Sequence, residues 1–503
     1  MFTRRKLLGT SLALASAPLI ASAVPAAAQS ANLKIAIDNS PNNMDPLKHT
    51  IASEYIYANL VFNGLTRMRE DLVLEPDLAE SWSFSGDLKQ WTFKLRSGVK
   101  FHNGRVFEAA DVVTVFQRVL DPANASPARS NFDMIEKIEA PDATTAVFTL
   151  KYPYGGFADI LSDRQVKITP RDALGGFATK PVGTGPFTFV SYTPGDRMVL
   201  AKNPTYFEAG LPKVAGVELR IIPEMAVRLA ALDAGDVDIV WDVPLDQVKT
   251  LQGKPNIRAE SVPTPSWDAA VMNNAIPPFN DKRVRRAFHL AVDKRDVAEI
   301  ALFGQGEPTH SPIPPSHPFY AKDIPIPKAD PAAAKKLLAE AGHPNGIKIQ
   351  LIVPVGRPIR ERAGVAMQQL AKAGGFDIEI KRVPFSSFEA EVLGKAPFWV
   401  DGFFGRPTID TSTYPFLHTG TSFNNILWKY SNPEVDKALS TARQTGDVAE
   451  QKKQYLAMQK AMSEDPPGFF CYSVNFACAY RQSVKGVKTH PSRWFDLRNA
   501  TLG

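Results

Sequence analysis

The sequence lacks most of the features that assign a chain to a special class. Two cysteines in 503 residues cannot build a disulfide framework. Beyond the first 23 residues, no stretch approaches the ~20 apolar residues that a membrane-spanning helix needs. No block of like charge forms a basic arm, so the sequence does not indicate a nucleic-acid-binding protein. With 44% hydrophobic and 22% charged residues, the composition is that of an ordinary globular protein.

The motifs of catalysis are missing as well. The sequence holds no GxSxG elbow, no HExxH, no P-loop and no paired cluster of cysteine or histidine ligands. Its eight histidines are scattered singly, as surface or hydrogen-bonded histidines usually are. We therefore expect a binding protein rather than an enzyme, with no cofactor and no metal site.

The N-terminus has the pattern of an export signal. Three positive charges in "TRRK" precede an apolar run from Leu7 to Ala23, and three alanines that end at residue 28 suit cleavage. A membrane anchor is the alternative, but the run is short, contains Pro18 and is followed by no stop-transfer pattern. We expect residues 1–28 to be a signal peptide and the mature chain to start near Gln29 in the periplasm. The paired arginines resemble the twin-arginine signal, although the residues after them match it loosely.

The size and charge of the mature chain set further limits. The full chain has a formal charge of +6, and loss of the signal leaves 55 basic against 52 acidic residues, or +3. About 470 residues exceed one hydrophobic core, so two or more lobes are expected.

Cys471 and Cys478 share the apolar stretch "FFCYSVNFACAY". They are either two buried free thiols or a disulfide across a tight hairpin.

Hydrophobic periodicity predicts strands and helices in mixed order. An apolar run predicts a strand over 33–38, and a one-sided apolar pattern predicts a helix over 109–121. Asn280 or Asp281 can cap a further helix that Gly304 closes.

The second half of the chain favours a partly parallel sheet. Asp330 caps a predicted helix that ends before Gly342. Strands over 347–354 and 376–385 bracket a helix around 361–373. The order strand, helix, strand indicates a βαβ unit.

One stretch, "VDGFFGRPTIDTSTYPF" at residues 400–416, fits neither a helix nor a long strand. Four aromatic residues, two glycines and two prolines surround Arg406, with acids at Asp401 and Asp410. Apolar flanks with a few polar groups among them predict a loop that lines a pocket.

Several motifs give the chain a family resemblance. Residues 64–113 contain "LAESW", "WTFKLR", "GVKFHNG" and a helix start in "AADVV". "GTGPF" at 183–187, "ALDAGDVDI", "NNAIPPFNDKRVRRAFHLAVDK" and "SNPEVDKAL" follow in order. These stretches resemble the periplasmic solute-binding proteins that serve peptide, nickel and opine ABC importers (family 5). The resemblance covers nearly all of the mature chain.

The resemblance implies an α/β fold, the two-lobed periplasmic-binding-protein fold (type II, cluster C), with an extra subdomain in the first lobe. The lobes close around the ligand about a hinge of crossing strands. The crossings are expected near residues 260–270 and 480–486. The expected divisions are 29–265 with 482–503 for lobe I, about 66–182 for its subdomain, and 266–481 for lobe II.

The resemblance also points to ligand-binding residues. In dipeptide-binding members, a loop that resembles "VPVGRPI" supplies an arginine for the ligand carboxylate, and Arg357 matches it. A guanidinium pairs with a carboxylate through two parallel hydrogen bonds, which also orients the ligand.

A second ligand loop shows a reversal of charge. Dipeptide binders carry "GWTGD", whose aspartate takes the ligand amine, and this chain has "GFFGR" with Arg406 in that place. A buried arginine that faces an ammonium is unfavourable. Arg357 and Arg406 together favour a ligand with two acidic groups or one phosphate. The opine binders of the family take amino-acid or sugar conjugates of this kind. Asp410 could replace the lost acid, or Arg406 could point outward or pair with Asp401.

Further ligand contacts are expected because certain residues occupy positions that face the cleft or touch the ligand in members of the family. Aromatic side chains of the second lobe and a first-lobe loop after the first strand are expected at the cleft. They are Trp267, Trp399, Phe403 and Phe404, and Asn42, Asn43 and Met44.

The implied function is capture of a small peptide-like or anionic conjugate and its delivery to an ABC permease dimer with its ATPases, by a monomer. An ordinary di- or oligopeptide binder is the alternative. A nickel-chelate binder is another, with His418 as the nearest candidate ligand. An enzyme built on this scaffold would differ from all of these by turning its ligand over.

Overall fold

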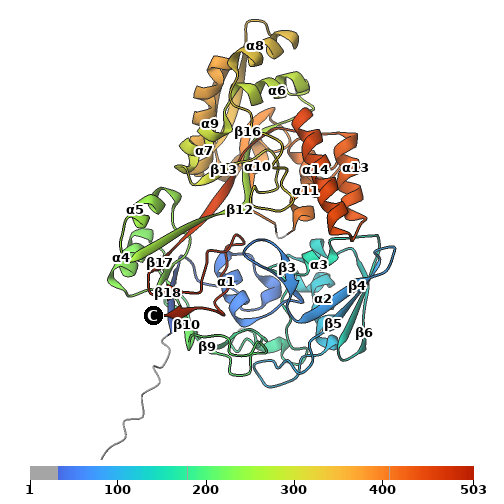
Figure 1. Cartoon of the computed structure of the whole chain (residues 1–503), viewed down its shortest axis with the longest axis vertical. Coiled ribbons are helices and arrows are strands. Elements are labelled where there is room, and N and C mark those ends of the chain that lie inside the picture. The colour runs from blue at the N-terminus through green and yellow to red at the C-terminus, as the bar shows by residue number, and fades with distance from the viewer. Residues whose placement is uncertain (1–31, 178, 407) are drawn as a thin grey trace, which may run out of the picture.

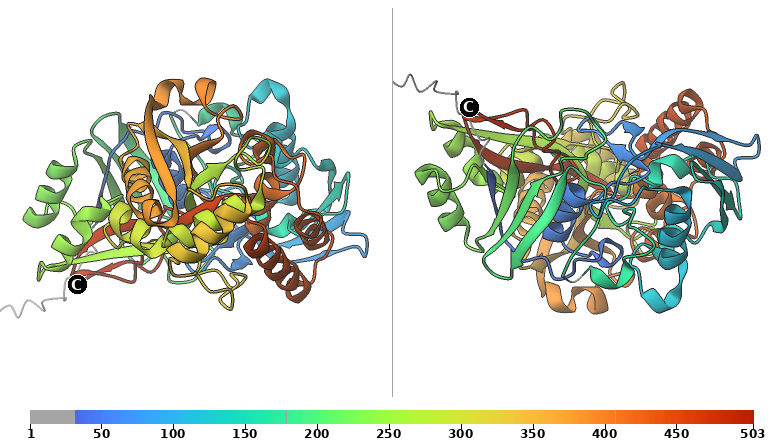
Figure 2. Two further views of the ribbon diagram at one scale, coloured as in Figure 1. Left: turned by 90° about the horizontal axis from the view of Figure 1, so that it is seen from above. Right: turned by 90° about the horizontal axis from the view of Figure 1, so that it is seen from below.

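The computed structural model describes residues 32–177, 179–406 and 408–503. The predicted signal peptide and the expected start at Gln29 lie outside the described residues. Figure 1 shows two lobes, one above the other, and a pair of long strands that runs from one into the other. Seen from above (Figure 2, left), α4 and α5 lie at one end of the molecule and α13 and α14 at the other.

The two long strands form an antiparallel ribbon that joins the lobes. They are β12 (Ile257–Met272) and β17 (Phe469–Arg481). In lobe I, β17 pairs with β11, and in lobe II, β12 pairs with β16, so one sheet passes through both lobes. The register shifts between Pro263 and Trp267, within the expected 260–270 crossing, and such an irregularity bends a ribbon.

The second crossing lies earlier than the expected 480–486. Phe476 and Tyr480 belong to the core of lobe I, whereas Cys471 belongs to the core of lobe II. The chain therefore changes lobe near residues 473–475. The expected boundary is displaced because the ribbon is apolar along its whole length, so the sequence does not mark where one core ends.

The two cysteines lie on the same strand. Cys471 and Cys478 are both buried and unbonded, and they face the cores of different lobes. An extended strand between them rules out the hairpin that a disulfide needs. Burial raises the pKa of each thiol to about 12, so neither is a reactive thiolate near neutral pH.

Lobe I rests on the part of the sheet ordered β11-β1-β10-β9-β8, in which β1 is parallel to both neighbours. The strand predicted over 33–38 is β1, and its side chains are almost all buried. The elements of lobe I are β1 (Leu33–Ile37), α1 (Ala52–Val61), β2 (Thr66–Met68), β3 (Leu74–Pro76), β8 (Phe187–Thr193), β9 (Arg197–Lys202), β10 (Gly216–Ile221), α4 (Met225–Ala234), β11 (Ile239–Val240), α5 (Val248–Gln252), β18 (Val484–Lys485) and β19 (Thr501–Leu502).

An extra subdomain is inserted in lobe I. Its antiparallel sheet has the order β4-β5-β7-β6, and α2 packs on it through Val112, Phe116 and Val119. The helix predicted over 109–121 is confirmed. The elements are β4 (Ala79–Phe84), β5 (Gln90–Leu95), α2 (Ala109–Leu120), β6 (Ile135–Asp142), β7 (Thr145–Leu150) and α3 (Phe157–Ile160).

Lobe II continues the sheet in the order β15-β14-β16-β12. β14 and β15 are parallel and α9 connects them, which confirms the predicted βαβ unit. The elements are α6 (Lys282–Ala291), α7 (Lys294–Leu302), β13 (Gly306–Pro308), α8 (Pro331–Glu340), β14 (Ile347–Val355), α9 (Pro358–Ala371), β15 (Phe376–Pro384), α10 (Phe385–Glu391), β16 (Phe398–Phe403), α11 (Ile409–Leu417), α12 (Ser422–Ile426), α13 (Pro433–Arg443) and α14 (Val448–Glu464).

The helix expected from Asp281 to Gly304 is two helices. Asp281 caps α6, but Val292 is extended and Asp293 caps α7 by accepting a hydrogen bond from the Arg295 backbone. The apolar spacing continues across this break, so periodicity alone joins the two helices.

The stretch at 400–416 is more regular than predicted. Its first residues belong to β16 and its last residues to α11. Thr408 caps α11 by accepting a hydrogen bond from the Thr411 backbone. The irregular part is limited to the short connection that carries Phe404 and Arg406.

Candidate ligand-binding site

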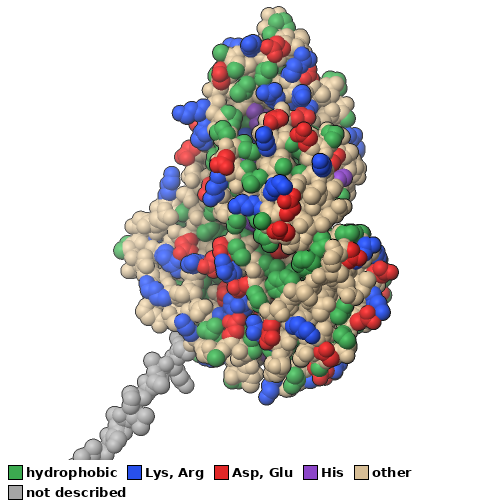
Figure 3. All heavy atoms as spheres, turned by 45° about the vertical axis from the view of Figure 1, so that its right-hand side comes forward, with side chains coloured by type: hydrophobic (Ala, Val, Ile, Leu, Met, Phe, Trp, Pro, Cys, Tyr) green, Lys and Arg blue, Asp and Glu red, His purple; other side chains and the backbone are tan. Residues whose placement is uncertain are grey.

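A cavity of about 490 Å³ lies between the lobes beside the crossing ribbon. β12, β16 and the start of α9 line it from lobe II, and residues 242–244 and 476–477 line it from lobe I. Its walls are mostly apolar with a few charged groups, and its size is that of a small-molecule site. Figure 3 shows hydrophobic side chains gathered along the seam where the lobes meet.

Arg357 stands at this cavity with no acidic partner. It is the N-cap residue of α9, and its guanidinium carbon lies 3.8 Å from the ring centre of Phe385. Among the described residues, no carboxylate oxygen lies within 4.0 Å of it. The positive end of α9 adds to the charge of the arginine. The guanidinium of Arg357 and the N-terminal end of α9 can therefore hold a carboxylate together, which is the role that the family resemblance predicts for Arg357.

A buried cluster that sequence reasoning missed lies in the same wall. Arg360 donates to Asp268 through Nε (3.2 Å), to Asp401 through Nη1 (2.8 Å) and to the carbonyl of Gly402 (2.6 Å). A Cβ at position 402 would meet Asp268 Oδ1 at 1.8 Å, so only glycine leaves room for this carboxylate. An acid inside each apolar strand, in "WDAAVM" and "FWVDGF", was the available signal.

The cluster has one cation for two carboxylates. Burial is the main cause that raises the pKa of Asp401 to about 6, against the lowering effect of Arg360. Burial also raises the pKa of Asp268, which accepts a hydrogen bond from the Tyr472 hydroxyl. Such a cluster favours an added positive charge, such as an ammonium group of a ligand.

Arg406 does not line the main cavity but an adjoining hollow of about 30 Å³. Phe404, Ser266 and Arg493 form part of both walls. The Arg406 guanidinium lies over the ring of Phe423 at 5.1 Å, and burial is the main cause that lowers its pKa.

Neither alternative for Arg406 fits the structure. Its side chain is partly buried rather than turned out to solvent, and Asp401 pairs with Arg360 instead. The expectation that Asp410 replaces the lost acid is also wrong. Its carboxylate is held by Arg443 at 2.8 Å and by the hydroxyl of Tyr154 at 2.8 Å, in a different hollow.

The aromatic candidates divide into two groups. Trp267 and Phe403 line the cavity with ring centres 5.2 Å apart, and Phe404 is 69% exposed at its edge. Trp399 is fully buried in the core of lobe II and lies outside the cavity wall.

The first-lobe loop lies away from the cavity. The backbone N–H groups of Asn42 and Asn43 both donate to Glu54, and Met44 is buried in the core of lobe I. None of the three residues is part of the cavity wall. The expected contact of this loop with the ligand is therefore not present in this arrangement.

Three further observations bear on the nickel-binding and membrane-anchor alternatives. No group of three or more potential metal ligands occurs within the described residues. Both ring nitrogens of His418 lie within hydrogen-bond distance of protein oxygens, those of Thr419 and Ser440. None of the helices in the described part of the chain is long and apolar enough to cross a bilayer.

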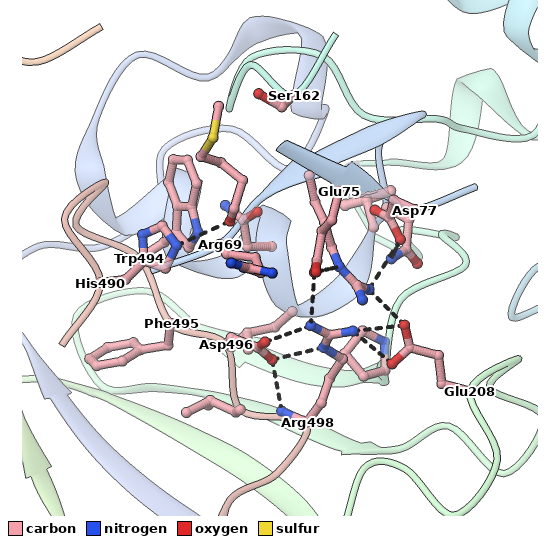
Figure 4. A pocket seen from close by; sticks show the side chains of 18 of the residues that line it. Arg69, Glu75, Asp77, Ser162, Glu208, His490, Trp494, Phe495, Asp496 and Arg498 are labelled. Atoms are coloured by element: carbon pink, nitrogen blue, oxygen red, sulfur yellow. Dashed lines mark hydrogen bonds and ion pairs between the residues drawn. The ribbon is translucent and has the colours of Figure 1, made fainter. Parts of the chain in front are cut away.

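A second cavity of about 370 Å³ within lobe I has a different character (Figure 4). Arg67 pairs with Glu75 at 2.5 Å and with Glu208 at 2.7 Å, and Arg498 pairs with Glu208 and Asp496, each at 2.6 Å. Because these charged side chains are paired with one another, we interpret the network as one that stabilises the C-terminal segment and not as a ligand-binding site.

Two lobes, a ribbon that crosses between them and a charged cavity at the crossing define a solute-binding protein. The family model for bacterial extracellular solute-binding proteins, family 5 (middle), matches residues 73–424. The chain belongs to this family, and the predicted two-lobed fold is confirmed.

Relatives and solved structures agree with this assignment. The chain is 29% identical to the glutathione-binding protein GsiB of Pectobacterium atrosepticum over 97% of this chain and 96% of that protein. AgaA of A. tumefaciens R10 in complex with agropinic acid is 26% identical, with a TM-score of 0.73 over 94% and 99% of the two chains. DppA of Helicobacter pylori in complex with the peptide STSA is 25% identical, with a TM-score of 0.72 over 93% and 98%.

Proposed function

We propose that this protein captures a small peptide-like solute with acidic groups, either a short acidic peptide or an opine-like conjugate, and delivers it to an ABC importer. The observation that carries the proposal is the pairing of charges in one cavity. Arg357 at the start of α9 has no acidic partner there, and Asp268 and Asp401 share a single arginine. A ligand with a carboxylate and an ammonium complements both groups.

The ligands of similar proteins support this class. They are glutathione, agropinic acid and the peptide STSA, each of which carries at least one carboxylic acid. Arg406, next to the main cavity, adds a cation that favours the more acidic members of the class.

The ribbon of β12 and β17, which joins the two lobes, supports a transport cycle in which the lobes close around the ligand. The protein acts in the periplasm as a monomer without a cofactor, and the ligand closes the lobes about β12 and β17. The closed form then docks on an inner-membrane permease pair with its ATPases. The ABC transporter association in the name of DppA supports this partner.

A binding panel tests the proposal. Glutathione, agropinic acid, Ser-Thr-Ser-Ala, Ala-Ala and a nickel–histidine mixture are each added to the purified mature protein, and the melting temperature and the calorimetric heat are recorded. A ligand in excess of its Kd stabilises the folded state by mass action, about 2.7 kcal/mol at 100 times Kd. We expect an acidic member to bind with the highest affinity.

The other outcomes favour the alternatives. Equal or tighter binding of Ala-Ala identifies an ordinary peptide binder. Binding that requires nickel identifies a chelate binder. Turnover of a bound compound, followed by mass spectrometry, contradicts a purely binding role.

A further inference from the structure

We infer that Arg164, Arg406 and Arg493 form an anion-binding subsite between the lobes, which takes a second acidic group of the ligand and couples it to closure. The inference rests on the proposed function for the identity of the ligand. Its chemical class is a carboxylate or phosphate group that extends from the main cavity. We call these residues the arginine subsite.

The three arginines converge from separate parts of the chain. Arg164 follows α3 in the extra subdomain, Arg493 lies in the C-terminal segment of lobe I, and Arg406 follows β16 in lobe II. All three line the hollow of about 30 Å³ beside the main cavity. Because Arg493 also lines the main cavity, a ligand bound there can extend one group into the hollow.

The donors of the subsite are poorly satisfied. Neither Arg164 nor Arg406 has a carboxylate oxygen within 4.0 Å among residues 32–177, 179–406 and 408–503. Nε of Arg493 is buried and has no hydrogen-bond partner in the described structure. A buried donor without a partner destabilises the folded protein, so such a group marks a place where a partner is missing.

The charges around the hollow do not cancel. Asp163 lies near Arg164 and Arg406, and Asp242 pairs with Arg493 at 2.9 Å. Three guanidinium groups against two carboxylates leave one positive charge. Burial is the main cause that acts against the charged form of Arg406; Asp163 favours that form and Arg164 opposes it. An anion in the hollow would offset the effects of burial and of Arg164.

The backbone at Arg493 is held in an uncommon conformation. Its φ is 67°, and its partner Asp242 has a φ of 56°, both in the left-handed region that costs energy for a residue with a Cβ. The stacking of His490 on Trp494, with ring centres 5.1 Å apart, holds the segment on both sides of Arg493 (Figure 4). Two strained residues on one wall of the cavity indicate that the position of the Arg493 side chain is functional.

The placement across the lobes gives the subsite a second role. Without an anion, Arg406 of lobe II faces Arg164 and Arg493 of lobe I, and like charges oppose closure. An anion between them turns this repulsion into attraction. The ligand thus favours the closed state by binding it better than the open state, which is the requirement for any ligand-driven change.

Matched ligands and variants test the subsite. Glutathione, with two carboxylates, and glutathione monoethyl ester, with one, are titrated calorimetrically into the wild type, Arg406→Ala and Arg164→Ala. The exposed Arg382→Ala of β15 is the control. In the wild type we expect the diacid to bind at least about 30-fold more tightly than the ester. Each subsite variant should reduce this ratio to a few-fold, while Arg382→Ala should leave it unchanged.

A second measurement does not depend on the ligand class. Inorganic phosphate is compared with chloride at equal ionic strength, with the melting temperature and the radius of gyration from small-angle scattering as readouts. Phosphate should stabilise and compact the wild type, and Arg406→Ala and Arg164→Ala should lose both effects. Folding of each variant is checked by circular dichroism.

The outcomes separate the two proposals. An unchanged ratio of diacid to ester in both variants overturns the subsite and leaves peptide capture standing. A phosphate response that depends on Arg406 and Arg164, in a protein that binds no member of the panel, supports the subsite and rejects the proposed function. No binding of any panel member together with no response to phosphate overturns both proposals.

Discussion

The hydroxyl of Tyr154 donates a hydrogen bond of 2.8 Å to Oδ2 of Asp410, and this bond joins the extra subdomain of lobe I to lobe II. Arg443 holds the same carboxylate with Nε at 2.8 Å and Nη2 at 3.0 Å. The backbone N–H of Gly155 donates to the carbonyl of Arg443 at 2.5 Å. A Cβ at position 155 would lie 1.8 Å from the carbonyl oxygen of Thr445, so glycine is needed for this approach. The lobes are therefore fastened at a point away from the ligand cavity.

Removal of the Tyr154 hydroxyl should weaken this fastening. Tyr154→Phe loses one hydrogen bond to a charged acceptor that Arg443 still satisfies, at a cost of about 0.5–1.5 kcal/mol to the closed form. We expect the affinity for the panel member that binds the wild type most tightly to fall up to about tenfold through faster dissociation, as measured by stopped-flow fluorescence. Tyr152→Phe is the control, since Tyr152 is 41% exposed and makes no hydrogen bond through its hydroxyl in the described structure. Equal dissociation rates in both variants would show that the contact does not contribute to closure.

Arg357→Ala should weaken binding of ligands that carry a carboxylate. The change removes a charge-assisted hydrogen bond that we value at about 1.5–3 kcal/mol. The calorimetric Kd should rise by a matching factor, about 10-fold to 150-fold. Arg382→Ala removes an exposed arginine of the same lobe and should leave the Kd unchanged. A Kd in Arg357→Ala within twofold of the wild type would place the carboxylate elsewhere.

Affinity for a ligand with a free amine should depend on the ionisation of Asp401. The groups that face Asp401 are Asp268 of β12 and Arg360 of α9, and Tyr472 of β17 bonds to Asp268. Burial raises the pKa of Asp401 to about 6, and the ammonium needs the ionised carboxylate. We expect about tenfold weaker binding at pH 5 than at pH 7. Asp401→Asn should bind more weakly at pH 7 and lose this step, and an N-acetylated ligand should not show it.

The same shift has a consequence for stability. Because the pKa of Asp401 is raised in the folded protein, its contribution to the free energy of unfolding is fully present below the ordinary carboxyl pKa near 4. It is lost as the pH rises to about 6. The melting temperature of ligand-free Asp401→Asn should therefore fall less between pH 4 and pH 6 than that of the wild type. Parallel curves would indicate that Asp401 titrates normally.

Arg406→Asp should close the lobes without a ligand. The new carboxylate would lie beside Arg164 and Arg493 and would take the place of the anion in the arginine subsite. We expect the ligand-free variant to be more compact by small-angle scattering and to bind acidic ligands more weakly. Arg406→Ala removes the repulsion without the attraction. A relief of about 1 kcal/mol raises the melting temperature by only about 1 °C in a chain of this length, because the entropy of unfolding grows with the number of residues. A ligand-free Arg406→Asp as open as the wild type would contradict the coupling of the subsite to closure.

Local pattern was enough to predict much of this protein. The alternation of apolar residues and the caps at Asp281 and Asp330 place strands and helices, because side-chain burial repeats with the period of the element. The βαβ order predicted the parallel pairing of β14 and β15, and the motifs predicted the family. The resemblance of the loop before α9 to a ligand loop of the family pointed to Arg357, and this residue lines the cavity.

Tertiary structure decided which charges meet. Asp410 was expected to serve a ligand, but Tyr154, 256 residues away in the chain, and Arg443 hold its carboxylate. Arg164 and Arg493 carry no local signal, yet the fold brings them to Arg406. Periodicity records which face of an element is buried, because that depends on neighbouring residues. The partner of a buried charge depends on how distant segments pack, and only the folded chain brings those segments together.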